Sequence, residues 1–207
     1  MRWIDPSAPA AVCVGPDGSR RSSAARLLTG SLPPPGALRA AADGLRFEAA
    51  APGRVISGGA FELAEAHATL AEALGPDLAP SLRPAFEWYA CRGAFFHNDA
   101  HYAGVLFGVW CVAGPPRDIV FPRLGLRAGA EPGDWVVFDP FEPHAVLDPG
   151  ERTYERARYV DARPSVFAGF EIEVNEASRL AFAIADSPRG VELSSRTRIN
   201  AETGGIE

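Results

Sequence analysis

The chain has 207 residues, 47% of them hydrophobic, which suffices for one well-filled core and is short for two. We therefore expect one domain over residues 1–207. The net charge of −6 and the scattered arginines form no basic stripe that could neutralise a phosphate backbone, so nucleic acid is not an expected partner. The longest apolar run, 103–114, is too short to span a bilayer and the N-terminus lacks the layout of a signal peptide, so we expect a cytoplasmic protein without a membrane partner.

Two features of residue usage narrow the chemistry. Cys13, Cys91 and Cys111 are odd in number and widely spaced, which matches neither a disulfide framework nor a thiolate zinc site, so we expect three small buried residues. The chain contains no lysine, which excludes Schiff-base catalysis and a Walker-type phosphate loop. Any anion that a side-chain cation binds must therefore be bound by arginine.

Residues 1–80 are predicted to form short strands and one helix that buttress the rest of the fold. Apolar residues recur at helical spacing at Leu63, Ala66, Leu70 and Leu74 and a glycine follows them, which predicts an amphipathic helix over 61–75. Candidate short strands precede this helix at 11–14, 45–50 and 54–58.

From residue 84 onward the sequence changes to short strand-like segments that turn residues separate. We expect strands within 85–99, 103–114, 117–129, 133–139, 144–148, 152–160, 165–174 and 180–185. Many short strands after one helix favour a barrel or a sandwich, with its core over 84–185. The polar residues 186–207 are expected to form a mobile tail, with an ordered final strand as the alternative.

The most informative stretch is the His-x-Asp motif at 97–99. In a strand, residues two apart project to the same side, so His97 and Asp99 can offer an imidazole and a carboxylate to one ion while Asn98 points away. His144 follows a second strand and a proline-bracketed turn. Two histidines and one carboxylate form the face that leaves three positions of an octahedral iron(II) open.

These motifs resemble those of a known family. The run "WYACRGAFFHND" resembles the segment that opens the metal site in iron(II)/2-oxoglutarate dioxygenases of the prolyl-hydroxylase-like kind, and "GDWVVFDPFEPHAVLDPGER" resembles their second half. The number of residues between Gly133 and His144 also matches the spacing in the second cupin motif, although the proline and inner glycine of that motif are out of register here. The resemblance covers about residues 84–175. It implies a mainly β fold with a flanking helix, a double-stranded β-helix of the jelly-roll or cupin-like type.

By this resemblance, His97, Asp99 and His144 are the iron(II) ligands, and 2-oxoglutarate is the cosubstrate. The protein would hydroxylate or desaturate a small molecule and release succinate and carbon dioxide. Because the Asp99 carboxylate fills a position that halogenating relatives leave for chloride, halogenation is not expected. No catalytic residue beyond the metal ligands is implied.

An arginine beyond His144 is expected to bind the distal carboxylate of 2-oxoglutarate, because its planar fork suits a carboxylate. Arg152, in "PGER", is the first candidate, and Arg158, Arg163 and Arg156 are the others. Tyr89 either hydrogen-bonds the oxo-acid or is a simple core residue.

Two further residues are candidates for contact with the substrate. His101 is expected in a loop beside the substrate, and Arg92 either contacts an anionic substrate or is a solvated edge residue. Two alternatives to the dioxygenase remain open. One is a cupin-type metalloenzyme that does not use 2-oxoglutarate, and the other is a metal-free β-barrel binding module. The oligomeric state and the substrate are not predicted.

Overall fold

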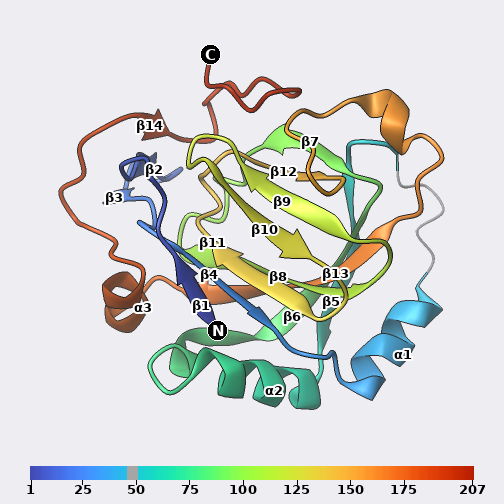
Figure 1. Ribbon diagram of the computed structural model, residues 1–207. Coiled ribbons are helices and arrows are strands. Elements are labelled where there is room, and N and C mark those ends of the chain that lie inside the picture. Colours follow the sequence, from blue (N-terminus) through green and yellow to red (C-terminus); the bar gives the residue numbers. More distant parts are fainter. Residues whose placement is uncertain (46–50) are drawn as a thin grey trace.

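The computed structural model describes residues 1–45 and 51–207 and consists mainly of antiparallel strands (Figure 1). The largest sheet has the order β1 (Arg2–Ile4), β4 (Leu27–Ser31), β11 (Asp134–Phe138), β8 (Val105–Ala113), β13 (Ser165–Glu173), β6 (Leu82–Cys91), β5 (Val55–Glu62). A four-stranded sheet has the order β10 (Leu126–Ala130), β9 (Arg117–Phe121), β12 (His144–Leu147), β7 (Ala94–His97). A three-stranded sheet has the order β14 (Glu192–Leu193), β2 (Val12–Val14), β3 (Arg20–Ser22), with β14 parallel to β2.

Helices cover the outer face of the seven-stranded sheet. The helices are α1 (Gly36–Gly44), α2 (Ala64–Leu74) and α3 (Glu176–Ala181), with two 3-10 helices at Ala79–Ser81 and Arg156–Tyr159. In Figure 1, α2 runs beneath this sheet. Its buried residues Leu70 and Leu74 belong to one cluster with Trp88, Trp110 and Phe170 of the sheet. No helix of the described residues is long and apolar enough to cross a membrane.

The inner face of the seven-stranded sheet packs against the four-stranded sheet. Phe107, Phe138 and Phe167 of the large sheet share an apolar cluster with Ile119 and Phe121 of β9. Successive side chains of a strand point to opposite faces of the sheet, so each strand of the large sheet contributes some side chains to the cluster under the helices and others to the cluster between the sheets. The protein is thus a two-layered β structure of the β-sandwich or cupin-like type.

The predicted helix is confirmed, with a later start. The sequence predicts 61–75, whereas α2 spans Ala64–Leu74 and ends at Gly75, whose φ of 78° suits glycine. Phe61 lies instead in β5, where its ring stacks on Trp88 with 4.4 Å between the ring centroids. The predicted strand at 45–50 lies outside the described residues, apart from residue 45.

Two predicted strands are wrong. Residues 152–160 contain the 3-10 helix Arg156–Tyr159, because Tyr154 and Tyr159 are both buried and stack with 5.3 Å between their centroids. In a strand, two residues separated by an odd number of positions point to opposite faces. Because the rings of Tyr154 and Tyr159 stack on each other, this segment cannot be a strand. Residues 180–185 overlap the end of α3, which begins at a capping box formed by Asn175 and Ser178.

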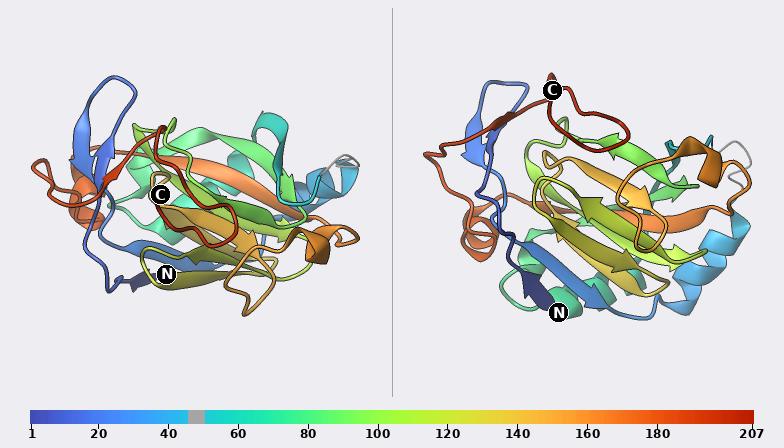
Figure 2. Two further views of the ribbon diagram at one scale, coloured as in Figure 1. Left: turned by 90° about the horizontal axis from the view of Figure 1, so that it is seen from above. Right: turned by 45° about the horizontal axis from the view of Figure 1, so that its top comes forward.

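The C-terminal residues pack against the four-stranded sheet. Figure 2 shows the last residues lying across this sheet beside β7. Phe96 N donates to Ala201 O at 3.0 Å, and Tyr154 N donates to Glu202 O at 2.8 Å. The structure therefore orders this segment against the sheet. The three cysteines are buried and free of disulfides, as the sequence predicts.

Candidate metal centre

His97 and His144 come together because the strands that carry them pair. His97 ends β7, His144 begins β12, and the two residues are partners in the antiparallel register. Asp99 follows β7 by two residues, and its Oδ2 lies 3.8 Å from His97 Nε2 and 3.5 Å from His144 Nε2. One ligand atom from each residue lies within 4.8 Å of the others. The structure therefore brings the three predicted ligands together.

Backbone carbonyls fix the tautomer of both histidines. His97 Nδ1 lies 2.7 Å from Phe95 O, and His144 Nδ1 lies 2.9 Å from Glu142 O. A carbonyl only accepts, so each Nδ1 carries the proton and each Nε2 presents its lone pair toward Asp99. This is the usual outer support of a metal-binding imidazole.

The charges of the site suit a divalent cation. Burial and the neighbouring His144 lower the pKa of His97 to about 4, so its imidazole is neutral at neutral pH. Burial raises the pKa of Asp99, but the nearby His144 and His97 side chains outweigh this effect and lower the pKa to about 2. Two imidazole nitrogens and one carboxylate fit iron(II) and its neighbours in the first transition series.

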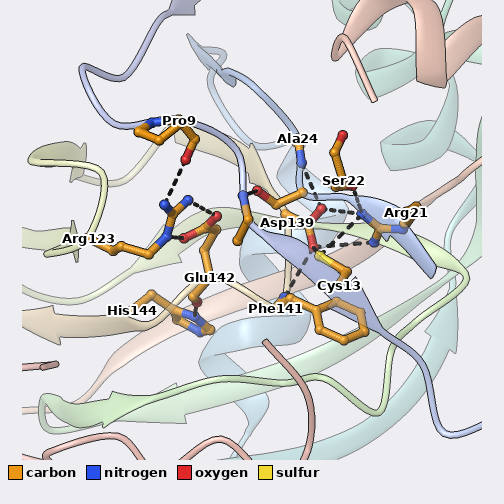
Figure 3. A network of polar contacts seen from close by, with 12 residues as sticks. Pro9, Cys13, Arg21, Ser22, Ala24, Arg123, Asp139, Phe141, Glu142 and His144 are labelled. Atoms are coloured by element: carbon orange, nitrogen blue, oxygen red, sulfur yellow. Dashed lines mark hydrogen bonds and ion pairs between the residues drawn. The ribbon is translucent and has the colours of Figure 1, made fainter. Parts of the chain in front are cut away.

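Figure 3 shows the buried network that supports the turn before His144. The Asp139 carboxylate, 1% exposed, pairs with Arg21 and accepts from Ala24 N at 2.9 Å and Phe141 N at 3.1 Å. Arg21 comes from the N-terminal hairpin, so this hairpin locks the turn in place.

A second pair supports the same turn. Arg123 Nε donates to Glu142 Oε2 at 2.7 Å, and the Glu142 side chain is 1% exposed. The carbonyl of Glu142 orients His144, and the carbonyl of Pro140 accepts from Asp99 N at 2.8 Å. One turn therefore positions two of the three ligands. None of these residues is among the predicted site residues, although the two acids of "DPFEP" beside His144 are a usable signal.

The triad opens into a cavity of about 280 Å³ between the two sheets. Phe107, Phe138, Val109 and Phe167 line it with apolar surface. Its polar lining, besides the triad, comes from Ser57, Glu87, Tyr89, His101 and Tyr102. Tyr89 and His101 thus both line the cavity, while Asn98 points away and donates to Ser194 O at 3.2 Å.

The structure does not bring the predicted arginines to this cavity. Arg152, Arg156, Arg158 and Arg163 are exposed and do not line the cavity. Arg158 pairs with Glu151 and Glu155. The 3-10 helix, which replaces the predicted strand, turns this segment along the outer surface. Arg92 also lies outside the cavity lining, and its guanidinium donates to Val160 O at 3.1 Å.

Arg117 is a buried basic residue near this cavity that is not among the predicted site residues. It begins β9 two residues before Ile119, which lines the cavity, so both side chains leave the strand on the same side. Arg117 is 3% exposed and pairs with Asp148, and its charge lowers the pKa of the cavity thiol Cys91, which burial raises to about 12. Its Nε is buried without a hydrogen-bond partner among the described residues. An arginine at the head of an apolar strand is the signal that marks it.

Solved structures show only weak likeness to this chain. A prolyl-4-hydroxylase from Pseudomonas putida aligns over 72% of this chain and 93% of its own, with 17% identity and a TM-score of 0.43. A putative mannose-6-phosphate isomerase from Ralstonia eutropha JMP134 aligns over 63% of this chain and 97% of its own, with 16% identity and a TM-score of 0.34. No protein-family model and no curated protein matches the chain.

Proposed function

We propose that this chain is a mononuclear iron(II) oxygenase on a double-stranded β-helix, which uses 2-oxoglutarate to hydroxylate or desaturate a small molecule. The observation that carries the proposal is the convergence of His97 Nε2, His144 Nε2 and an Asp99 oxygen within 4.8 Å at the edge of a cavity. Bound iron(II) would supply the activation of dioxygen and the oxidative decarboxylation that yields succinate and carbon dioxide.

The residues of the chain have three tasks in this function. The two histidines and Asp99 hold the ion from one side and leave its other positions free. The Asp99 carboxylate fills the position that chloride would need, which favours hydroxylation or desaturation over halogenation. The apolar walls at Phe107 and Phe138 exclude water from the reacting groups.

Arg117 is our candidate for the distal carboxylate of 2-oxoglutarate. An oxo-acid dianion in an apolar cavity requires a cation, and none of the residues that line this cavity is an arginine. Arg117 begins β9, whose Ile119 lines the cavity, and it is buried with an Nε that has no hydrogen-bond partner among the described residues. The four predicted candidates, Arg152, Arg156, Arg158 and Arg163, are solvated on the outside.

A cupin-type metalloenzyme that does not use 2-oxoglutarate is the second candidate. Two observations favour it. The guanidinium of Arg117 already pairs with Asp148, and the carboxylate of Glu87 inside the cavity repels a second anion. Both candidates share the metal site and differ only in the cosubstrate.

Sequential titration separates the candidates. Manganese(II), and then 2-oxoglutarate, are added to the metal-free protein in a calorimeter, and succinate is measured after incubation with iron(II), 2-oxoglutarate and air. The oxygenase requires metal binding, oxo-acid binding that depends on metal, and succinate. Metal binding without oxo-acid binding supports the second candidate. A protein that binds neither iron(II) nor manganese(II) contradicts both, and a metal-free binding module is then left.

A further inference from the structure

Glu87 places a fixed negative charge inside the cavity. On β6, Glu87, Tyr89 and Cys91 alternate with residues that face the helices, and all three line the cavity. The Glu87 carboxylate accepts hydrogen bonds from Ser57 Oγ and, at 2.8 Å, from the Tyr89 hydroxyl. No arginine or histidine of residues 1–45 and 51–207 forms an ion pair with it within 4.0 Å, although the chain has 20 arginines and four histidines.

Three aromatic residues, Tyr89, Tyr102 and Phe107, line the cavity together with this carboxylate. The hydroxyls of Tyr89 and Tyr102 lie 3.2 Å apart. The ring of Phe107 meets Tyr89 edge-on at 5.8 Å and stacks on Tyr102 at 5.4 Å, measured between centroids. Gly169 leaves space for the Tyr89 ring, since a Cβ at this position would overlap the ring carbons. Ring faces attract cations, so the three rings and the carboxylate all favour a positive charge.

The Glu87 carboxylate and the three predicted metal ligands line the same cavity. Tyr102 N donates to Asp99 O at 2.9 Å, so the loop that carries the third metal ligand also carries one of the rings beside Glu87. Burial raises the pKa of the Tyr102 hydroxyl, and the negative charges of Glu87 and Asp99 raise it further. The Tyr102 hydroxyl thus experiences both carboxylates.

We propose that the substrate carries an ammonium group, which Glu87 binds together with the rings of Tyr89, Tyr102 and Phe107. Glu87 supplies the opposite charge, and the hydroxyls of Ser57 and Tyr89 hold its carboxylate in position. The apolar surface between this group and the triad accommodates the aliphatic part of the same molecule. The substrate class is therefore an amine, and the assignment of this ligand as a substrate rests on the proposed function.

Three probes of equal chain length test this inference. Hexylamine, hexanol and hexanoate are titrated into the metal-free protein by NMR, because an amine cannot then ligate a bound ion. We expect hexylamine to bind about tenfold tighter than hexanol, which corresponds to about 1.4 kcal/mol, and hexanoate to bind weakest. In Glu87→Gln, hexylamine should bind no tighter than hexanol, while the affinity for hexanol stays unchanged.

Asp99→Asn is the matched control, since an ammonium ion could instead occupy the metal site. Preference for hexylamine that survives Asp99→Asn and disappears in Glu87→Gln supports the inference. Preference that disappears only in Asp99→Asn overturns it, as does equal binding of all three probes to the wild-type protein. If Glu87→Gln fails to fold, Asp99→Asn still tests the inference, because a preference for hexylamine that survives in this variant supports it and a preference lost in this variant overturns it. Because no metal is present, failure here leaves the proposed function standing, whereas absence of metal binding contradicts that function alone.

Discussion

His97 and His144 are register partners across β7 and β12, and their rings lie 4.5 Å apart between centroids. This pairing converts two histidines that are distant in the sequence into adjacent donors. Each imidazole is oriented by a carbonyl from a residue two positions earlier in its own chain segment. The geometry of the centre therefore follows from strand pairing and local turns.

Replacing a ligand should weaken metal binding strongly. Loss of Asp99 removes the only anionic donor of the triad, so we expect Asp99→Ala to raise the Kd for manganese(II) by about 100-fold or more, or about 2.7 kcal/mol. Calorimetric titration of the metal-free protein measures this change. His101→Ala is the control, because His101 lines the cavity outside the triad. Equal losses in both variants would contradict the assignment of ligands.

The Arg123–Glu142 pair should stabilise the fold and orient His144. Glu142→Gln leaves a buried guanidinium without its counter-charge, so we expect a loss of about 3–5 kcal/mol in the free energy of unfolding by urea. Metal affinity of the folded variant should also fall by about tenfold to 100-fold, because the turn orients a ligand.

An exposed ion pair supplies the control for this prediction. Glu155→Gln removes one partner of Arg158, whose side chain is 43% exposed, and should change stability by less than about 1 kcal/mol. It should leave metal affinity unchanged. If Glu142→Gln behaved like this surface variant, the turn would not depend on its buried pair.

The metal-free protein should lose stability in mild acid. The pKa of His97 is lowered from 6.5 to about 4 by burial and by His144, so between these values the unfolded chain binds a proton that the folded protein does not. Stability therefore falls as the pH decreases through this window, by about 2 kcal/mol at about pH 4.5. Asp99, whose pKa is lowered to about 2, stays ionised in this pH window, so its contribution to the free energy of unfolding is retained.

Unfolding by urea at pH 7 and at about pH 4.5, after chelation, measures this effect. His97→Gln removes the titrating group and should flatten the dependence between these two pH values. A wild-type protein whose stability is constant across this range would contradict the burial of a neutral His97.

Much of the fold and the triad could be predicted because they depend on local patterns. Alternation and turn residues mark β8, β11, β12 and β13, and His-x-Asp at a strand end places two ligands on one side. The segment after residue 150 could not be predicted in this way. Its course depends on the stacking of Tyr154 on Tyr159, a tertiary contact that outweighs strand propensity.

For the charged residues around the site, too, the sequence predicts only those that local patterns place. Glu87 could be placed from the sequence, because it lies two positions before Tyr89 and alternation brings both to one face. Arg21 and Asp139 are 118 positions apart, and only the docking of the N-terminal hairpin brings them together. Contacts of this range are set by topology and leave no periodic signal.

Crowding at Gly169 should hold Tyr89 in place. A Cβ at this position would overlap the Tyr89 ring, so we expect Gly169→Ala to cost about 1–3 kcal/mol in the free energy of unfolding. A Cβ at Gly104 would meet no heavy atom within 4 Å, so Gly104→Ala should be nearly neutral. Urea denaturation of both variants measures the difference, and equal stabilities would contradict close packing at Tyr89.

Arg117 should determine the affinity for 2-oxoglutarate if the protein uses this cosubstrate. A carboxylate in an apolar cavity depends on a cation, so Arg117→Gln should raise the Kd for 2-oxoglutarate by about 100-fold in the manganese-loaded protein. Because Arg117 also pairs with Asp148, the double variant Arg117→Gln with Asp148→Asn keeps the buried charges balanced and separates binding from folding.

Arg152→Gln and Arg158→Gln are the matched controls, since both side chains are exposed and lie outside the cavity lining. Calorimetric titration should give wild-type affinity for 2-oxoglutarate in both controls and weakened affinity in the Arg117 variants. A loss of affinity confined to Arg152→Gln or Arg158→Gln would mean that the segment after residue 150 moves to the cavity when the oxo-acid binds. In that case these arginines would lie on the surface only in the absence of 2-oxoglutarate, and the assignment of Arg117 as the residue that binds the distal carboxylate would be wrong.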